Sequence, residues 1–290
     1  MFEALRRSGL SPAPVVSLDR GGLRAACAGA DALLDARPVG DDRPLEVALE
    51  AGLSAAALTA APDRLVRLRE RFHLPAIAAG VSLVVGLEAG AAAAELAAVG
   101  LAEAPALGAL EAVTSVAVRW RFARPGDALT ALDGRGWAWE SGQRTRRRAG
   151  GPPDLDGPRA ALWIPSGATV SLPWRLQVRQ VEVCLSLPAA LGRPLALLAG
   201  GPARRLGRRL PGGGAARLVV VVEGRGARRV RRETVVTLVD RGALTAALTA
   251  AALTHLISGE TPPGILGPGT CPGPKAIGLL DWTPPRQVDL

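Results

Sequence analysis

The sequence predicts an α/β protein in two parts, a mostly parallel sheet followed by an α+β segment with a mixed or antiparallel sheet. Up to about residue 108, apolar runs of strand length alternate with helical periodicity, which is typical of βαβ units. Beyond residue 112, longer runs alternate apolar and polar residues, as antiparallel strands do. The chain has 290 residues, of which 48% are hydrophobic, and this length suits one large domain or two modest ones.

The first part is predicted to contain short strands joined by helices. Residues 44–52 should form a helix, because Pro44 suits the first turn and Gly52 suits the end. Another helix should open at Pro62 and run over 62–74, followed by a further helical turn that Gly80 ends. The expected strands are 15–18, 30–36, 53–59 and 81–86, and further helices are expected at 20–29 and from residue 91 onward.

The second part is predicted to contain longer strands, and a helix then closes the chain. A helix over 243–258 carries its leucines along one stripe and ends at Gly259. A Pro/Gly loop over 261–273 follows, and Trp282 is expected to anchor the tail. The expected strands are 113–122, 179–187, 217–226 and 231–240, the last two as a hairpin, whereas the Gly/Pro/Arg-rich stretches 141–159 and 200–214 are predicted to be loops.

The composition disfavours membrane, secreted and metal-binding proteins. The first residues contain no apolar run typical of a signal peptide. The longest apolar run, 80–100, contains Glu88 and Glu95, and a charge near the middle of a membrane costs about 2.5–3.5 kcal/mol. We therefore expect a cytoplasmic protein without a membrane partner. The spacing of Cys and His predicts neither a disulfide framework nor a metal site, and His255 is expected to be structural. These residues are Cys27, Cys184, Cys271, His73 and His255.

The net charge of +9 raises the possibility of a nucleic-acid partner. However, Lys275 is the only lysine, and Asn and Tyr are absent. This is the bias of a GC-rich genome rather than selection for phosphate contacts, so a nucleic-acid partner is not expected. The arginine clusters at 144–148, 204–209 and 225–232 are predicted to be solvated, and an anion-binding patch is the alternative.

Four segments, in this order, resemble one protein family. They are AACAGADALLDARPVGDDRPLEVALEAGLSAAALT (25–59), RERFHLPAIAAGVSLVVGLEAG (69–90), LPWRLQVRQVEVCLSLP (172–188) and ALTAALTAAALTHLISGETPPGILGPGT (243–270). Together they resemble the saccharopine dehydrogenase-like oxidoreductases, including their bacterial trans-acting enoyl reductase branch. The resemblance implies an incomplete Rossmann-like domain at 1–108, an α+β substrate-type domain at 109–240, and a C-terminal helix and tail at 241–290 that pack back on the core. It also implies hydride transfer with NADP or NAD.

The chain departs from that family where the cofactor is bound. It has no G-x-G-x-x-G turn, the motif that brings a helix N-terminus to the pyrophosphate, and it begins where the third strand of such a domain is expected. By resemblance, Arg37, Pro38 and Val39 would edge the cofactor cleft, in place of an Asn-Cys-Ala-Gly-Pro type turn. Glu88 would be an acid or base near the substrate.

The Gly86-Leu-Glu-Ala-Gly90 stretch is predicted to be a strand-to-helix turn. Its G-x-x-x-G spacing is not that of a phosphate-binding loop, and Glu88 would repel a phosphate. The alternative is that Gly86 and Gly90 line the cleft between the two domains.

Three functional hypotheses follow. The first is a divergent homologue that is non-catalytic or depends on a partner, and that binds a partner enzyme or an acyl or polyketide-type ligand. The second is an NAD(P)-dependent oxidoreductase, of enoyl reductase or dehydrogenase type, whose first βαβ unit lies upstream of Met1 or in a separate chain. Its substrate would be acyl, polyketide-like or derived from an amino acid. The third is binding of anions or nucleic acid by the arginine clusters. Because loss of the first strand would expose a sheet edge, a homodimer or partner complex is expected.

Overall fold

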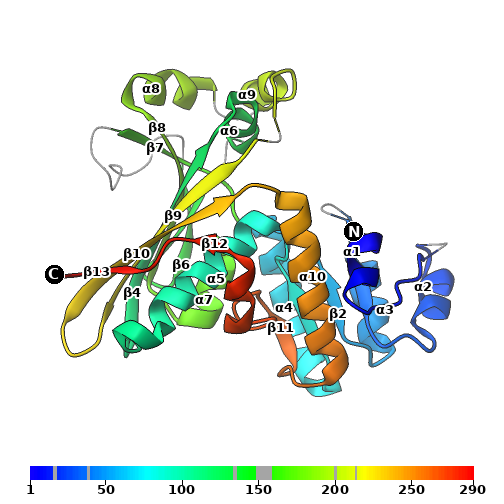
Figure 1. The fold of residues 1–290 in the computed structure, drawn as a ribbon. Coiled ribbons are helices and arrows are strands. Elements are labelled where there is room, and N and C mark those ends of the chain that lie inside the picture. Colours follow the sequence, from blue (N-terminus) through cyan, green and yellow to red (C-terminus); the bar gives the residue numbers. More distant parts are fainter. Residues whose placement is uncertain (16–17, 38–39, 133–135, 148–158, 199–200, 213) are drawn as a thin grey trace. The chain divides into compact units, whose positions relative to one another are not determined.

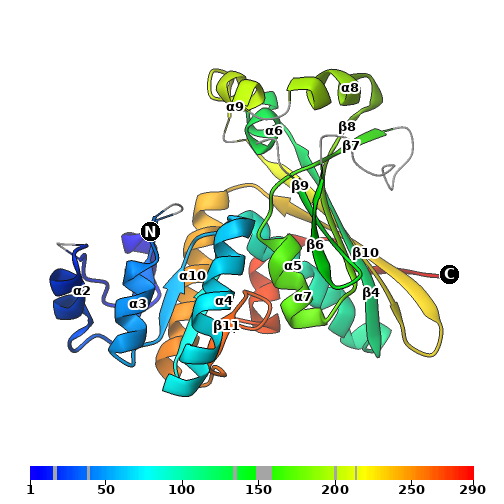
Figure 2. The same ribbon diagram turned by 180° about the vertical axis from the view of Figure 1, so that it is seen from behind.

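The computed structural model describes residues 1–15, 18–37, 40–132, 136–147, 159–198, 201–212 and 214–290. The chain forms two compact units (Figures 1 and 2). Unit 1 comprises Met1–Leu96 and Arg241–Leu279, and unit 2 comprises Ala97–Asp240 and Leu280–Leu290. Each unit is built around its own sheet, so the C-terminal segment first returns to unit 1 and then completes unit 2.

Unit 1 contains a parallel sheet with the strand order β1-β2-β3-β11. Its strands are short and buried, as expected for a parallel sheet with both faces covered, and they confirm the predictions over 30–36, 53–59 and 81–86 with shorter bounds. Residues 16 and 17 of the predicted strand 15–18 lie outside the described residues. The strands are β1 (Leu33–Asp35), β2 (Ala55–Ala57), β3 (Ser82–Val85) and β11 (Gly264–Leu266).

Strand β11 corrects the prediction of a loop over 261–273. A three-residue Gly-Ile-Leu run between prolines and glycines carries no periodic signal, and only pairing with β3 makes it a strand. Its first residue has a φ of +116°, and a Cβ there would lie 2.9 Å from the His73 ring. Gly264 is therefore required, because it tolerates this backbone conformation and leaves room for the imidazole.

Helices cover both faces of this sheet. α1 (Phe2–Arg7) and α10 (Arg241–Ser258) lie on one face, and α3 (Arg43–Glu50) and α4 (Pro62–Ala79) lie on the other (Figures 1 and 2). The core on the first face joins Leu5 of α1, Val84 of β3 and Leu253 of α10. α2 (Arg20–Cys27) packs on α3, and its N-terminus is capped by the Asp19 carboxylate. The predicted helices are confirmed, and α4 runs through Pro75 as one helix.

Unit 2 contains a mixed sheet with the order β12-β10-β9-β4-β8-β5-β6, to which β7 and β13 add at β8 and β10. β4 and β8 are parallel and the other pairs are antiparallel, which confirms the predicted mixed sheet and the β9–β10 hairpin. Trp282 pairs with Val236, as an anchor of the tail should. The strands are β4 (Ala112–Phe122), β5 (Gly136–Glu140), β6 (Gln143–Arg147), β7 (Arg159–Trp163), β8 (Gln180–Pro188), β9 (Ala216–Arg225), β10 (Arg229–Leu238), β12 (Asp281–Trp282) and β13 (Arg286–Asp289).

The two stretches predicted to be loops contain regular structure. Residues 141–159 include β6 and the first residue of β7, while 148–158 lie outside the described residues. Residues 200–214 include α9 (Gly201–Gly207). β6 has no apolar alternation and is stabilised by its partner strand: Arg144 lies over the Trp137 ring and Arg147 pairs with Glu140. The sequence pattern also missed α6 (Pro125–Ala131), α7 (Ala168–Leu176) and α8 (Ala189–Leu198).

The most apolar helix of the described chain is α5 (Ala89–Glu103), which with the turn after it is long and apolar enough to cross a membrane. In the structure 78% of Ala89–Leu107 is buried, as in a core helix. A buried arginine of β10 bonds the last turn of this helix and the turn that follows it. Arg232 donates to the carbonyls of Leu101 at 2.8 Å, Leu107 at 2.8 Å and Gly108 at 2.7 Å, which offsets the negative end of the helix.

Candidate functional site at the carboxyl edge of the parallel sheet

Ligands of open α/β sheets bind beyond the carboxyl ends of the strands. In unit 1 that edge is formed by the described residues after β1, β2, β3 and β11, namely 36–37, 40–42, 58–61, 86–88 and 267–271. Arg37 and Glu88 both lie on it, but they follow β1 and β3, with β2 between them. Pro38 and Val39, the other residues expected at a cofactor cleft, lie outside the described residues.

A cluster of charges, in which Asp35 and Arg64 are buried, lies at the end of β1. We call Asp35, Arg37, Asp41, Asp42 and Arg64 the carboxyl-edge cluster. The Asp35 carboxylate is 2% exposed, and it accepts a bond of 2.8 Å from Arg37 Nε and one of 3.1 Å from Arg64 Nη2. Burial raises the pKa of Asp35, but the hydrogen bonds from both guanidinium groups outweigh it and hold this pKa below its usual value.

Arg64 links this cluster to the first turn of α4. Its Nε donates to Asp42 Oδ1 at 3.2 Å, and its Nη2 donates to the Asp41 carbonyl at 3.1 Å. Arg64 Nη1 and Thr59 Oγ1 are buried without a hydrogen-bond partner among the described residues. Such groups need a water or ligand atom to complete them, so both mark polar positions beside the β2–α4 turn.

Arg37 is folded back onto the cluster. Its Nη2 lies 3.5 Å from Asp41 Oδ1 in addition to the bonds with Asp35, and these contacts raise the pKa of its guanidinium. Gly40 leaves the room for this, since a Cβ there would lie 2.8 Å from Arg37 Cζ. The positive charge of Arg37 is therefore compensated by two carboxylates.

The turn after β3 leads directly into α5, which confirms the predicted strand-to-helix turn. Gly86 has a φ of +86°, which requires glycine, and Gly90 is already in the first turn of α5. Glu88 caps that helix: its Oε2 accepts from the Ala91 amide at 3.3 Å. The Ala89 amide donates instead to Thr245 Oγ1 at 3.0 Å.

A second carboxylate, Glu95 of α5, is fully buried at the turn after β11. Its Oε1 accepts from the Gly269 amide at 2.8 Å. A Cβ on Gly267 would lie 2.5 Å from the same oxygen, so the Gly-Pro-Gly turn makes room for this side chain. Sequence reasoning treated Glu95 only as a charge in an apolar run, and the glycine pair at 267 and 269 was the signal that could have pointed to it.

We next ask whether the described edge fits the pyrophosphate of NAD(P), which needs free amides at a helix N-terminus. α3 and α4 have Pro44 and Pro62 in their first turns, and proline has no amide hydrogen. The Ala89 and Ala91 amides of α5 are taken by Thr245 and Glu88. The starts of α3, α4 and α5 therefore fit a pyrophosphate poorly.

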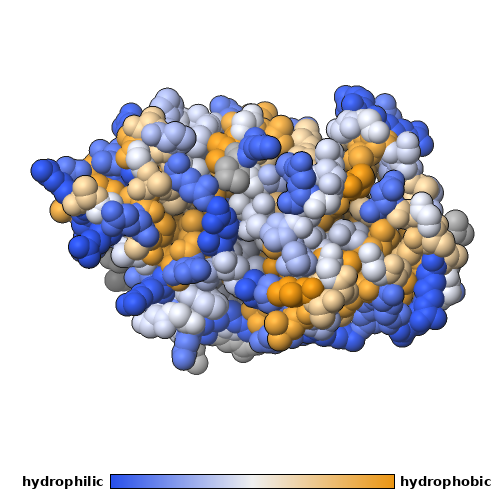
Figure 3. Space-filling view, turned by 90° about the horizontal axis from the view of Figure 1, so that it is seen from below, coloured by the Kyte–Doolittle hydropathy of each residue, from blue (hydrophilic) through white to orange (hydrophobic). Residues whose placement is uncertain are grey.

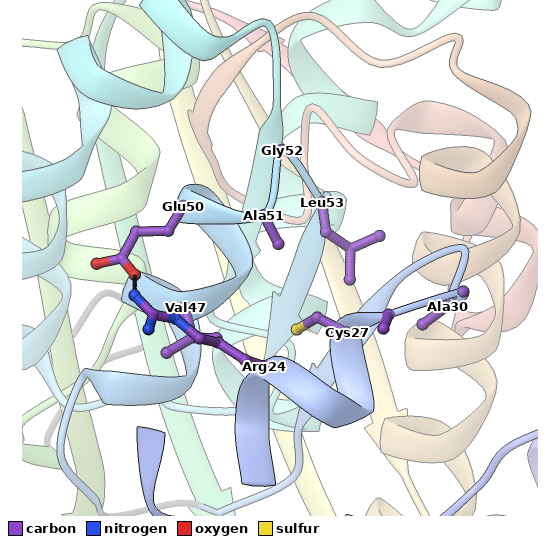
Figure 4. Close-up of a pocket in the computed structure, with 10 residues that line it drawn as sticks. Arg24, Cys27, Ala30, Val47, Glu50, Ala51, Gly52 and Leu53 are labelled. Carbon is purple, nitrogen blue, oxygen red and sulfur yellow. Dashed lines mark hydrogen bonds and ion pairs between the residues drawn. The ribbon is translucent and has the colours of Figure 1, made fainter. Parts of the chain in front are cut away.

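A separate pocket of about 660 Å³ lies at the opposite edge, near the amino ends of β1 and β2 (Figure 4). Arg24 and Glu50 form an ion pair of 3.1 Å beside it. Cys27 faces it, but burial raises the pKa of this thiol, which disfavours a reactive thiolate. In the described part of the chain, no group of three or more His, Cys, Asp or Glu residues is placed to hold a metal ion.

The described arginines of the basic clusters fall into two groups. Several are exposed, as the sequence predicts, namely Arg205, Arg208, Arg209, Arg225, Arg228 and Arg229. Others, and Arg229 as well, are engaged within unit 2. Arg144 stacks on Trp137 at 4.0 Å, and Arg229 lies 3.4 Å from Glu223. Arg232 is 2% exposed and bonds backbone carbonyls. At Arg144, Arg229 and Arg232 a phosphate would have to compete with these contacts.

The two units, a parallel sheet between helices and a mixed sheet with helices, define an α/β fold of the Rossmann-like type. The chain is similar to apo saccharopine dehydrogenase (L-Glu forming) from Saccharomyces cerevisiae, with 13% identity over 99% of this chain and 91% of that chain and a TM-score of 0.57. This likeness confirms the predicted resemblance and fold class. At this identity it concerns the fold alone.

Two further structures are similar at lower scores. One is the homospermidine synthase of Legionella pneumophila in complex with NAD, with 10% identity over 91% of this chain and 77% of that chain and a TM-score of 0.47. The other is the inositol dehydrogenase homolog of Azotobacter vinelandii with NAD+, with 11% identity, 96% and 85% coverage and a TM-score of 0.37. Scores this low carry no argument about this chain. No protein-family model and no curated protein sequence matches it.

Proposed function

We propose that this chain is a divergent saccharopine dehydrogenase-like protein that does not transfer hydride by itself and acts by binding a partner. One observation carries the proposal: the polar groups at the carboxyl edge of the parallel sheet bind one another. Asp35, together with Asp41 and Asp42, neutralises Arg37 and Arg64. Thr245 and Glu88 occupy the Ala89 and Ala91 amides of α5.

A phosphate-bearing cofactor would have to break this arrangement. Separating Asp35 from Arg64 removes one partner from a buried ion pair, which costs about 3–5 kcal/mol in proteins. At the start of α5, the pyrophosphate would meet the carboxylate of Glu88 where a free helix N-terminus is needed. The cost of separating this ion pair and the repulsion by Glu88 both weaken cofactor binding by this chain alone.

The second candidate is an NAD(P)-dependent oxidoreductase of enoyl reductase or dehydrogenase type, acting on an acyl, polyketide-like or amino-acid-derived substrate. The likeness to the Saccharomyces cerevisiae enzyme, which covers 91% of that chain, favours it. In that case Arg37, Pro38 and Val39 would edge the cofactor cleft and Gly86 and Gly90 would line the substrate cleft. Glu88 would have to leave its helix cap to act as an acid or base.

We also propose a homodimer or partner complex formed at β1, in a cytoplasmic protein. Among the strands that the structure describes, β1 is the outermost of its sheet. The Leu33 amide and the Asp35 carbonyl bond to residues beside β2, so the backbone groups of Leu34 face away from β2. An edge of this kind is a template for another strand. Light scattering at about micromolar concentration tests this, since a monomer throughout would contradict it.

A cofactor titration distinguishes the two candidates. NADPH and then NADH are added to the full chain, and energy transfer from its six tryptophans and the melting temperature are followed. No saturable signal up to about millimolar cofactor supports the partner-binding proposal, whereas saturable binding with a raised melting temperature overturns it. Glu88→Gln is the informative variant, because binding that appears only in this variant identifies the carboxylate as the barrier.

A further inference from the structure

Helix α8 of unit 2 presents an apolar face to solvent. Exposed hydrophobic residues occur elsewhere, and the face drawn in Figure 3 shows several orange areas separated by hydrophilic ones. On α8, however, every exposed residue that the structure describes is apolar. Leu197 is 88% exposed, Leu191 47% and Leu198 39%. The side chain of Leu197 is therefore almost fully exposed to solvent and contributes little to the core.

These leucines form one continuous stripe. At about 100° per residue, Leu191, Pro194, Leu197 and Leu198 fall within an arc of about 120°. The opposite side of α8 is fixed to the sheet: a Cβ on Gly192 would lie 2.3 Å from Ala160 Cβ of β7. The close approach that Gly192 permits therefore orients the helix, and the leucine stripe points outward as a consequence of packing.

The helix that follows α8 in the chain contacts it and carries exposed basic residues. No Asp or Glu occurs between residues 183 and 222. The next helix, α9, and the turn after it expose Leu206, at 44%, together with Arg205, Arg208 and Arg209. α9 packs on α6, where the carboxylate of Asp127 accepts a bond of 3.1 Å from the Gly214 amide. We call the exposed residues of α8, α9 and 208–209 the α8–α9 patch.

We propose that the α8–α9 patch is a peripheral membrane-binding surface for anionic lipid. Exposed leucines flanked by arginines are the chemistry of helices that lie in the plane of an anionic bilayer surface. This arrangement differs from the spanning helix that the charges of 80–100 argue against, and it goes beyond the proposed function.

The size of the apolar stripe on α8 favours lipid over a folded protein partner. The ten residues of α8 extend for about 15 Å, and a stripe about 10 Å wide covers about 150 Å². A stable protein interface needs about 800 Å² on each side, whereas shallow insertion of a few leucines next to basic residues suffices for reversible binding to a membrane.

Vesicle co-sedimentation tests the proposal with the full chain. Phosphatidylcholine vesicles with and without phosphatidylglycerol are compared at low and high salt. We expect binding to the anionic vesicles that falls as salt shortens the Debye length from about 10 Å at 0.1 M to about 3 Å at 1 M. Leu197→Asp should weaken this binding about tenfold or more, because it places a carboxylate among the inserted side chains.

The matched control is Leu74→Asp on α4, since Leu74 is 73% exposed but lies in unit 1. It should bind vesicles like the wild type. The double variant Arg205→Glu/Arg208→Glu should lose the part of vesicle binding that depends on salt concentration. The proposal is overturned if the wild type does not bind anionic vesicles at low salt, or if both leucine variants behave alike. Binding to soluble polyglutamate without binding to vesicles would also overturn it and indicate an acidic protein partner. None of these readouts depends on NAD(P).

Discussion

Replacement of Asp35 by Asn tests the central element of the candidate site. The side chains of Asp35 and Arg64 are 2% and 5% exposed, so neither charge is well hydrated. Removing one partner of a buried pair costs about 3–5 kcal/mol. Arg64 keeps Asp42 and Arg37 keeps Asp41, and the Asn oxygen still accepts one bond. We therefore expect the lower end, a loss of about 3 kcal/mol in the free energy of unfolding.

The chain offers a matched control for this variant. Glu50 also accepts bonds from two arginines, Arg20 and Arg24, but the three side chains are 40–62% exposed. Because exposed pairs contribute about 0–1 kcal/mol, Glu50→Gln should change stability by less than about 1 kcal/mol. Because both variants remove a carboxylate that is bonded to two arginines, the difference between their effects on stability measures the contribution of burial.

Urea unfolding followed by far-UV circular dichroism measures both variants. Tryptophan fluorescence serves as an internal reference, because all six tryptophans belong to unit 2. Asp35→Asn should move the dichroism transition of unit 1 more than the fluorescence transition. A loss no larger than that of Glu50→Gln would refute the reasoning, as would a double-mutant cycle with Arg64→Met that shows no coupling.

The pH dependence of stability gives a second test of Asp35. Its pKa in the folded protein is below the unfolded value of about 3.9. The stabilisation is therefore present above about pH 4 and is lost as the pH falls through the folded pKa. Wild type should lose this contribution in acid, and Asp35→Asn should show no such loss.

Two further predictions concern residues that hold elements in place. His73 Nδ1 accepts from the Ile265 amide at 3.1 Å, and burial, with a smaller effect of Arg69, lowers the pKa of His73 below about 6.5. Because the folded state then binds fewer protons than the unfolded state, the free energy of unfolding should fall as the pH drops below about 6.5. A His73→Gln variant whose stability keeps the same pH slope would contradict this. Arg232→Met leaves the carbonyls of Leu101, Leu107 and Gly108 without their donor and should cost about 2–4 kcal/mol in thermal or urea unfolding, whereas its neighbour Arg231, paired with Glu233 at 3.6 Å, should tolerate Met within about 1 kcal/mol.

Much of unit 1 could be predicted from the sequence, because its elements repeat a local pattern. Apolar runs that end at Asp35, Ala57 and Val85, each followed by a helix, indicate βαβ units without any knowledge of distant contacts. The same logic failed for β11 and β6. Gly-Ile-Leu and Gln-Arg-Thr-Arg-Arg have no strand pattern of their own, and each becomes a strand by pairing with a neighbour, β3 or β5.

The sequence predicted where in the fold the candidate site lies, but not which side chains define its chemistry. Arg37 and Glu88 lie on the predicted edge, yet the groups that define it are Asp35 and Arg64, which are 29 residues apart. One signal was available: Arg64 falls on the buried stripe of α4, four residues before Leu68. A charge on such a stripe indicates a buried partner, but the sequence does not name it.

By itself, the sequence determined the α/β class, the order of the βαβ units, the mixed sheet that follows and the turn at Gly86, because hydrophobic periodicity and turn chemistry act over neighbouring residues. Only the tertiary structure decided that Asp35 pairs with Arg64, that Glu95 fills the glycine turn after β11, and that α8 points its leucines outward. These outcomes depend on burial and on partners distant in the chain. Both set the strength of charges and the exposure of a helix face, and neither is encoded in local spacing.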